Sequence, residues 1–108
     1  MAARELLPGT LDMLNLKTLT RAPNHGYGIA QYIQAVSSGA LRVGEVSLYP
    51  ALQRLLINDW VTARWCTSET GRKVRMYTIT PAGRRQLAAE AKDYGFVIDG
   101  IARVMGNA

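Results

Sequence analysis

The sequence predicts a mainly α-helical protein with one small β hairpin, an α+β fold, and three observations lead to this expectation. The chain has 108 residues, of which 48% are hydrophobic, and this suits one small globular domain. Apolar residues recur at helical spacing in several stretches of the sequence. Between residues 60 and 80 they alternate with polar residues instead, which is typical of β strands.

Two helices are expected in the first third of the chain. Thr10 can cap a first helix that ends near Thr20 and carries a broad leucine surface. The segment RAPNHG at 21–26 is rich in residues that break helices, so it predicts a turn. A second helix is then expected from about Tyr27 to Ser37. Its apolar side comprises Ile29, Ala30, Ile33 and Val36.

A proline decides where a third helix is expected to begin. Proline is tolerated in the first turn of a helix, because the amides there have no intrahelical partner. In SLYPALQRL at 47–55 we therefore expect Ser47 to be the N-cap and Pro50 to lie in the first turn of a helix that ends near Asn58. The buried stripe of this helix would comprise Leu48, Ala51, Leu52, Leu55 and Leu56. Its exposed side would comprise Ser47, Tyr49, Pro50, Gln53 and Arg54.

A hairpin and a long last helix complete the predicted order. WVTARWC at 60–66 and RMYTIT at 75–80 alternate as strands do, and a polar, glycine-containing tip separates them. Thr80 and Pro81 are typical N-cap and N1 residues of a helix, here reaching about residue 105. Apolar residues recur along this helix at alternating intervals of four and three residues, as in a coiled coil. This pattern predicts that the helix packs against a second copy of the chain. The expected dimer interface comprises Leu11, Leu14, Leu87, Ala91, Tyr94, Ile98, Ile101 and Met105.

The basic residues are distributed unevenly along the chain. The net charge is +5, from thirteen Lys and Arg against eight Asp and Glu, which is compatible with an anionic partner such as nucleic acid. The segment 71–89 holds no acidic residue. Arg72, Lys73 and Arg75 on the hairpin would attract phosphates, although charges can also protect the edge of a solvated hairpin from pairing. Arg84 and Arg85 could equally contact phosphates or be plain surface residues.

Several classes of function find no support in the residues. One His, one Cys and eight scattered acids show no spacing typical of a metal site or of a nucleophile with its base, so we expect no enzyme, metal or cofactor. No apolar run approaches the roughly 20 residues that span a bilayer. No secretory signal is evident, so we expect a cytoplasmic protein in which Cys66 is an inert thiol.

Three helices, a hairpin and a final helix follow the order of a winged helix-turn-helix, with 1–80 as the DNA-binding domain and 81–108 as a dimerisation helix. The sequence also resembles the PadR-like transcriptional regulators. The stretches that carry the resemblance are LLPGTLDMLNLKTL at 6–19, HGYGIAQYI at 25–33, SLYPALQRL at 47–55 and YTITPAGRR at 77–85. The sequence departs from the family at Gly28, where an acidic residue is common, and at Asp59-Trp60-Val61, which replaces Gly-Leu-Ile.

The resemblance implies a homodimeric repressor that binds double-stranded DNA at a two-fold-symmetric operator. The third helix would enter the major groove, the hairpin would reach the backbone or minor groove as a wing, and the last helix would form the dimer. The chain length fits the small subtype of the family, which has a single C-terminal helix. The resemblance also implies a small aromatic effector. The rival interpretation is a winged helix that serves protein interaction or dimerisation without specific DNA binding, which would expose acidic or apolar residues on the third helix.

The third helix supplies the first group of candidate DNA contacts. Ser47 and Tyr49 can bond to phosphates or base edges, and Gln53 can pair with adenine. Pro50 belongs to the same exposed surface. Arg54 can bind a phosphate or form a salt bridge within the protein, and both alternatives stay open.

Other candidates lie outside the third helix. His25 and Tyr27 begin the second helix, whose free amides favour an anion; alternatively, His25 serves the turn and Tyr27 packs its ring. Trp60 and Trp65 can stack on a planar effector or pack the wing against the helices. Tyr94 and Phe96 in the last helix could likewise either stack on an effector or pack within the protein.

Overall fold

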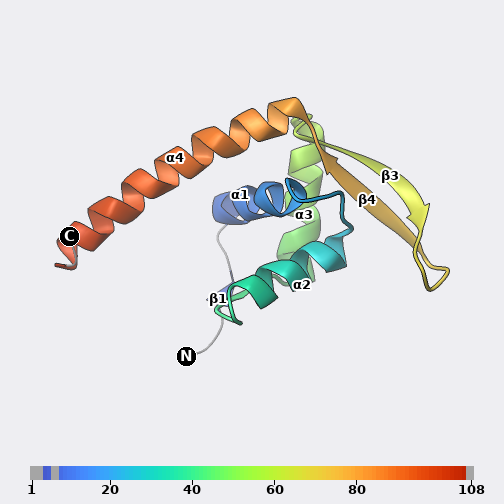
Figure 1. Cartoon of the computed structure of the whole chain (residues 1–108), viewed down its shortest axis with the longest axis horizontal. Helices are drawn as coiled ribbons and strands as arrows, with labels where there is room; N and C mark the ends of the chain where they lie inside the picture. The colour runs from blue at the N-terminus through green and yellow to red at the C-terminus, as the bar shows by residue number, and fades with distance from the viewer. Residues whose placement is uncertain (1–3, 6–7, 107–108) are drawn as a thin grey trace.

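A computed structural model describes residues 4–5 and 8–106 of the chain. Within these residues, four helices and two small two-stranded sheets follow one another (Figure 1). The elements are β1 Arg4–Glu5, α1 Pro8–Leu19, α2 Gly26–Val36, β2 Leu41–Arg42, α3 Glu45–Ile57, β3 Val61–Thr67, β4 Lys73–Ile79 and α4 Pro81–Val104. The predicted α+β fold class is confirmed.

Helix α1 lies at the centre of the structure, in contact with α2, α3, α4 and β4 (Figure 1). It begins at Pro8, so the expectation that Thr10 would cap it was wrong; proline at the first position already has the φ angle of a helix. Leu11 is only 1% exposed, so it was wrongly assigned to the dimer interface. Leu11 is covered by neighbouring elements of its own protomer, and that burial leaves no surface there for a partner.

Polar side chains are also buried along α1, and they differ in how they are satisfied. Thr18 donates to the Leu14 carbonyl at 2.9 Å, and Asp12 bonds to Arg54 of α3. Asn15 is fully buried, and its amide has no hydrogen-bond partner among the described residues. An unsatisfied buried amide costs stability, so Asn15 is a weak point of the core.

Helix α3 begins at Glu45, two residues before the predicted N-cap. The expectation that Ser47 would be the N-cap was therefore wrong. Gly44, in an extended conformation, is the N-cap, and its carbonyl accepts from the Leu48 and Ser47 amides at 2.9 and 3.1 Å. Pro50 consequently lies in the second turn, not the first. It lacks the amide that would bond to the Val46 carbonyl, so one helical hydrogen bond is missing.

The hairpin of β3 and β4 is antiparallel, with Val61 opposite Ile79 at its base and Thr67 opposite Lys73 near its tip. Backbone bonds between Asn24 and Tyr77, of 3.1 and 2.9 Å, attach its base to the turn before α2. Trp60 packs against the core as one alternative expected. Trp65 is 67% exposed because the hairpin extends beyond the helices, so the core-packing alternative was wrong for it (Figure 1).

Helix α4 begins as predicted. Thr80 is its N-cap, and the Thr80 hydroxyl accepts from the Gly83 amide at 3.0 Å and donates to the Asp59 carbonyl at 2.7 Å. Asp59 follows the Asn58 C-cap of α3 at φ 59°, a left-handed conformation that glycine adopts more easily. Gly83 packs so closely on the Trp60 carbonyl that a β-carbon would collide with it. Beyond this junction the first half of α4 passes along α1, and its C-terminal part extends away from the other helices (Figure 1).

Candidate nucleic-acid interface

Residues from α2, α3 and the hairpin border one hollow of about 700 Å³, here called the wing hollow. It brings together six of the predicted DNA contacts, although they come from three separate segments of the chain. These are His25, Tyr27, Tyr49, Arg72, Lys73 and Arg75. The hollow also includes Glu45, Trp65 and Tyr77, which were not predicted as contacts. Its wall on the hairpin side is basic, and its wall on the helix side offers aromatic rings and polar groups.

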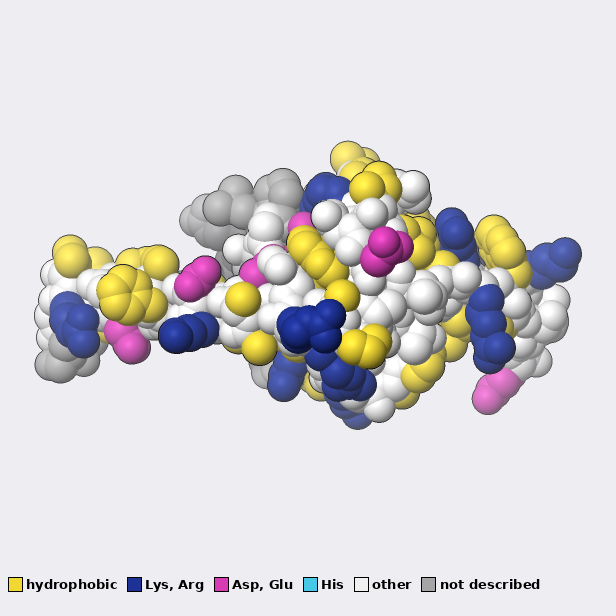
Figure 2. Space-filling model, turned by 90° about the horizontal axis from the view of Figure 1, so that it is seen from above, with side chains coloured by type: hydrophobic (Ala, Val, Ile, Leu, Met, Phe, Trp, Pro, Cys, Tyr) yellow, Lys and Arg dark blue, Asp and Glu magenta, His cyan; other side chains and the backbone are white. Residues whose placement is uncertain are grey.

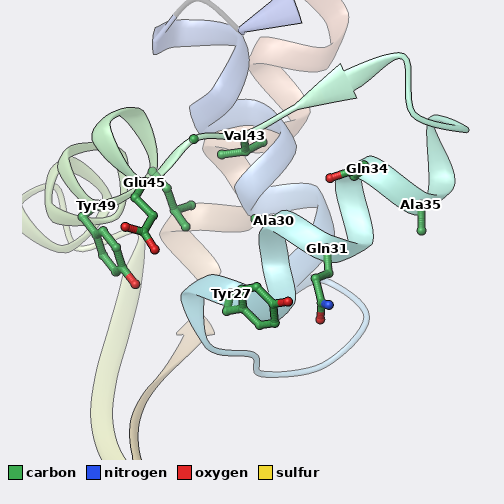
Figure 3. A pocket seen from close by; sticks show the side chains of 10 residues that line it. Tyr27, Ala30, Gln31, Gln34, Ala35, Val43, Glu45 and Tyr49 are labelled. Atoms are coloured by element: carbon green, nitrogen blue, oxygen red, sulfur yellow. The ribbon is translucent and has the colours of Figure 1, made fainter. Parts of the chain in front are cut away.

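A second hollow, of about 690 Å³, lies between α2 and the start of α3 and adjoins the wing hollow. Tyr49 and Glu45 project from α3, and Tyr27 and Gln31 from α2, around this space (Figure 3). Tyr27, Glu45 and Tyr49 border both hollows. The first turns of α2 and α3 thus contribute polar groups to both hollows.

His25 serves the turn and also keeps a polar group for a ligand. Its Nδ1 accepts from the Gly28 amide at 3.1 Å, as an N-cap does. A neutral ring that accepts at Nδ1 carries its proton on Nε2, so Nε2 can donate to a phosphate. Asn24 accepts from the His25 amide at 2.8 Å, and a side chain at Gly28 would collide with this Asn24 amide. That contact explains the glycine at 28.

The tyrosines of the wing hollow differ in environment. Tyr27 and Tyr49 are exposed, so the packed-ring alternative for Tyr27 was wrong. Tyr77 lies buried below them, and burial raises the pKa of its hydroxyl, against an opposing effect of nearby Arg75. The exposed hydroxyls of Tyr27 and Tyr49 can donate hydrogen bonds to a ligand.

Arg54 is turned toward α1. Its guanidinium donates to both carboxylate oxygens of Asp12, at 2.8 and 3.2 Å, and this bonding raises the pKa of Arg54. The salt-bridge alternative is therefore the one that the structure contains. Gln53 and Pro50 are exposed, whereas Ser47 is half-buried.

The exposed side of α3 also carries residues that sequence reasoning missed. Val46 is 91% exposed, Ile57 is 71% exposed, and Glu45 is the first residue of the helix. These residue types are the ones that the rival protein-interaction interpretation would place here. Glu45 and Val46 were missed because the helix was expected to begin at Ser47, and the only signal was the Gly44 that precedes them.

Basic side chains cluster on the hairpin and around the start of α4, in the view of Figure 2. Arg84 and Arg85 are exposed at that start and border neither hollow. Arg84 instead lines a groove of about 480 Å³ between α1 and α4. The hairpin cations and the α4 cations therefore belong to different surfaces.

The remaining residues assigned to a dimer interface lie along α1 and α4. Leu14, Leu87, Ala91 and Tyr94 line the groove between these helices. Ile98, Ile101 and Met105 are exposed farther along. Phe96, Val97 and Val104 add to the apolar surface beside them. Such a large apolar surface on one helix is unusual for a protein that stays monomeric.

Two other kinds of site find no support in the part of the chain that the structure describes. In residues 4–5 and 8–106, no group of three or more His, Cys, Asp or Glu side chains could hold a metal ion. None of the described helices is long and apolar enough to cross a membrane.

Comparison with known proteins finds one matching family and several similar proteins. Residues 16–89 match the model of the transcriptional regulator PadR-like family. An uncharacterised protein X of Lysinibacillus sphaericus is 27% identical over 97 residues, which cover 90% of this chain and 89% of that protein. An uncharacterised 37.1 kDa protein in a Streptomyces fradiae transposon is 43% identical over 80 residues, which cover 74% of this chain and 21% of that protein.

Solved structures show the same fold. A transcriptional regulator from Clostridium thermocellum has a TM-score of 0.80 at 24% identity. The match covers 88% of this chain and 92% of the regulator's chain. A PadR-like regulator from Bacillus cereus has a TM-score of 0.75 at 24% identity, covering 90% and 92%.

Proposed function

Because the chain belongs to the PadR-like family of transcriptional regulators, we propose that it represses transcription as a homodimer bound to a two-fold-symmetric DNA operator. Family membership implies DNA binding, and the wing hollow is the observation that carries the assignment of the DNA-contacting surface. In this proposal residues 1–80 bind DNA and residues 81–108 form the dimer.

The chemistry around the wing hollow supports a phosphate contact there. Arg72, Lys73 and Arg75 would neutralise phosphates and release counterions. The exposed hydroxyls of Tyr27 and Tyr49 and the Nε2 of His25 can donate to phosphate oxygens. A strand of duplex DNA lying between the hairpin and α3 would meet all of these groups.

The exposed side of α3 would then face the major groove. Gln53 can bond to the N6 and N7 atoms of adenine, which makes it the candidate for direct base readout. Ser47, which is half-buried at the edge of this surface, would bond to a phosphate or a base edge. Arg54 would act indirectly, because its bond to Asp12 fixes α3 against α1.

The apolar side of α4 supports the homodimer. Ile98, Ile101 and Met105 are exposed in the protomer, and pairing with a second copy would remove them from water. Two α3 helices held in this way would contact half-sites about one helical turn of DNA apart.

Regulation by a small aromatic molecule is a further part of the proposal. The groove between α1 and α4 has apolar walls that include Leu87 and Tyr94, and it adjoins the proposed dimer helix. A ligand that preferred one angle between the two DNA-binding lobes would shift the population away from the DNA-binding form.

Selection of random duplexes by the purified protein, repeated at two salt concentrations, tests the proposed function. We expect a two-fold-symmetric motif whose binding weakens steeply with salt. Salt-sensitive binding without a motif would indicate a nonspecific basic protein. Absence of DNA binding would favour the rival interaction module, for which the exposed Val46 and Ile57 are the supporting observation.

A further inference from the structure

We infer that Val46, with Pro50 beside it, contacts the C5-methyl group of a thymine in each half-site and so determines part of the operator sequence. The inference rests on the proposed function. It concerns a specificity-determining residue that neither the sequence pattern nor the family match assigns.

Val46 is the most exposed large hydrophobic residue among those that the structure describes, at 91%. A single exposed apolar residue is common on protein surfaces, so exposure alone assigns no role. The position of Val46 in α3, together with its exposure, indicates a role in base contact. It is the second residue of α3, and the N-terminal residues of a recognition helix are those that reach base edges.

The residues around Val46 leave it accessible to a flat partner. Gly44, the N-cap, has no side chain that could cover it. Leu48, Leu52 and Leu55 are buried on the opposite side of α3. Val46, Pro50 and Gln53 follow each other at spacings of four and three on the outer side.

Pro50 extends the apolar surface of Val46. It lies four residues later, so its ring stands next to the backbone of Val46, where a helical amide would otherwise be. Valine in a helix has essentially one side-chain rotamer, so little entropy is lost when it is buried. Together the two residues form a rigid apolar spot of the kind that a methyl group fits.

Polar groups flank this spot on both sides. The carboxylate of Glu45 forms no ion pair within the described residues and can accept hydrogen bonds only. Gln53 can both donate and accept. In the major groove a T·A pair presents the methyl group and O4 acceptor of thymine beside the N6 donor and N7 acceptor of adenine, so an apolar spot near Gln53, which both donates and accepts, matches it. Cytosine would place a polar amino group against the spot and lacks the methyl group.

The test replaces thymine by uracil in the selected operator, because this change removes only the methyl group. At one position, replaced in both half-sites, we expect uracil to weaken binding about 15-fold, because two methyl groups worth about fourfold each are removed. The replacement is made at each thymine in turn, symmetrically in both half-sites, and the dissociation constant is measured by fluorescence anisotropy. The natural protein is used, so this arm does not depend on the folding of a variant.

A variant then connects the methyl group to Val46. Val46→Ala is expected to weaken binding to the thymine operator and to bring the thymine and uracil operators close to equal affinity. Ile57→Ala, which truncates an exposed aliphatic residue at the other end of α3, is the control and should keep the difference.

The outcomes separate this inference from the function on which it rests. A symmetric operator that binds equally well with uracil at every position would overturn the inference and leave the proposed function intact. The same conclusion holds if Val46→Ala keeps the full difference between thymine and uracil. If no duplex is selected at all, the proposed function itself fails, and the inference fails with it.

Discussion

The Arg54 guanidinium of α3 is bound by both carboxylate oxygens of Asp12 in α1, at 2.8 and 3.2 Å. This pair joins the candidate recognition helix to the central helix of the fold. Its two partners are 42 residues apart in the sequence. The pair therefore fixes how α3 is held while its outer side stays available.

Asp12→Asn should lower the free energy of unfolding by about 1 kcal/mol, a modest value because Arg54 is 39% exposed and solvent screens the pair. The measurement is urea unfolding at low and high salt, since salt should reduce the effect. Asp99→Asn, at an exposed position in α4, is the control and should change stability little. An Asp12 variant as stable as the control would mean that the pair contributes nothing.

Gly83→Ala should destabilise the protein by about 2 kcal/mol or more, because a β-carbon would collide with the Trp60 carbonyl, which belongs to the backbone and cannot move cheaply. Gly95→Ala in the same helix meets no atom within 4 Å and should stabilise by about 0.5–1 kcal/mol through helix propensity. Thermal unfolding of the two variants compares them directly. Equal effects at both positions would refute the close packing of α4 on Trp60.

Ile98→Asp should convert the protein to monomers, because it places a charge on the apolar side of α4 that we assign to the dimer. Sedimentation velocity over a range of concentrations measures the change. Lys92→Asp, at an exposed position of the same helix, should leave the dimer intact. An Ile98 variant that remains fully dimeric would show that another surface forms the interface.

Replacing Arg72, Lys73 and Arg75 by alanine should weaken binding to all duplexes and flatten its salt dependence. The slope of log affinity against log salt should fall by about 0.9 for every phosphate that the variant no longer neutralises. The matched control replaces Arg85, Lys92 and Arg103, which removes the same charge from α4. A control that flattens the slope as much would indicate that net charge matters and the hairpin does not.

Local signals in the sequence predicted much of the fold. Thr80 and Pro81 marked the start of α4, and the change of period marked the hairpin. The start of α3 was wrong because Pro50 occupies a second turn whose beginning is set by the extended backbone at Gly44. The burial of Leu11 was missed because periodicity does not reveal that α1 packs against α2, α3, α4 and β4 at once.

Part of the candidate site could also be predicted, because local motifs mark some of its residues, whereas the rest depends on tertiary packing. Motifs named residues that meet around the wing hollow, since each lies at a helix start or on the hairpin. The bond between Arg54 and Asp12 and the exposure of Trp65 depend on tertiary packing and on how far the hairpin extends. Val46 was missed because its exposure follows from the true start of α3.

The affinity of the Tyr49→Ala, Gln53→Ala double variant for the selected operator tests the central claim most directly. Both side chains are exposed on α3, so their loss should leave the fold intact, which circular dichroism can verify. Fluorescence anisotropy should show a dissociation constant raised about tenfold or more, while Lys92→Ala in α4 binds as the natural protein does. Unchanged affinity in the double variant would contradict the claim that this side of α3 contacts DNA.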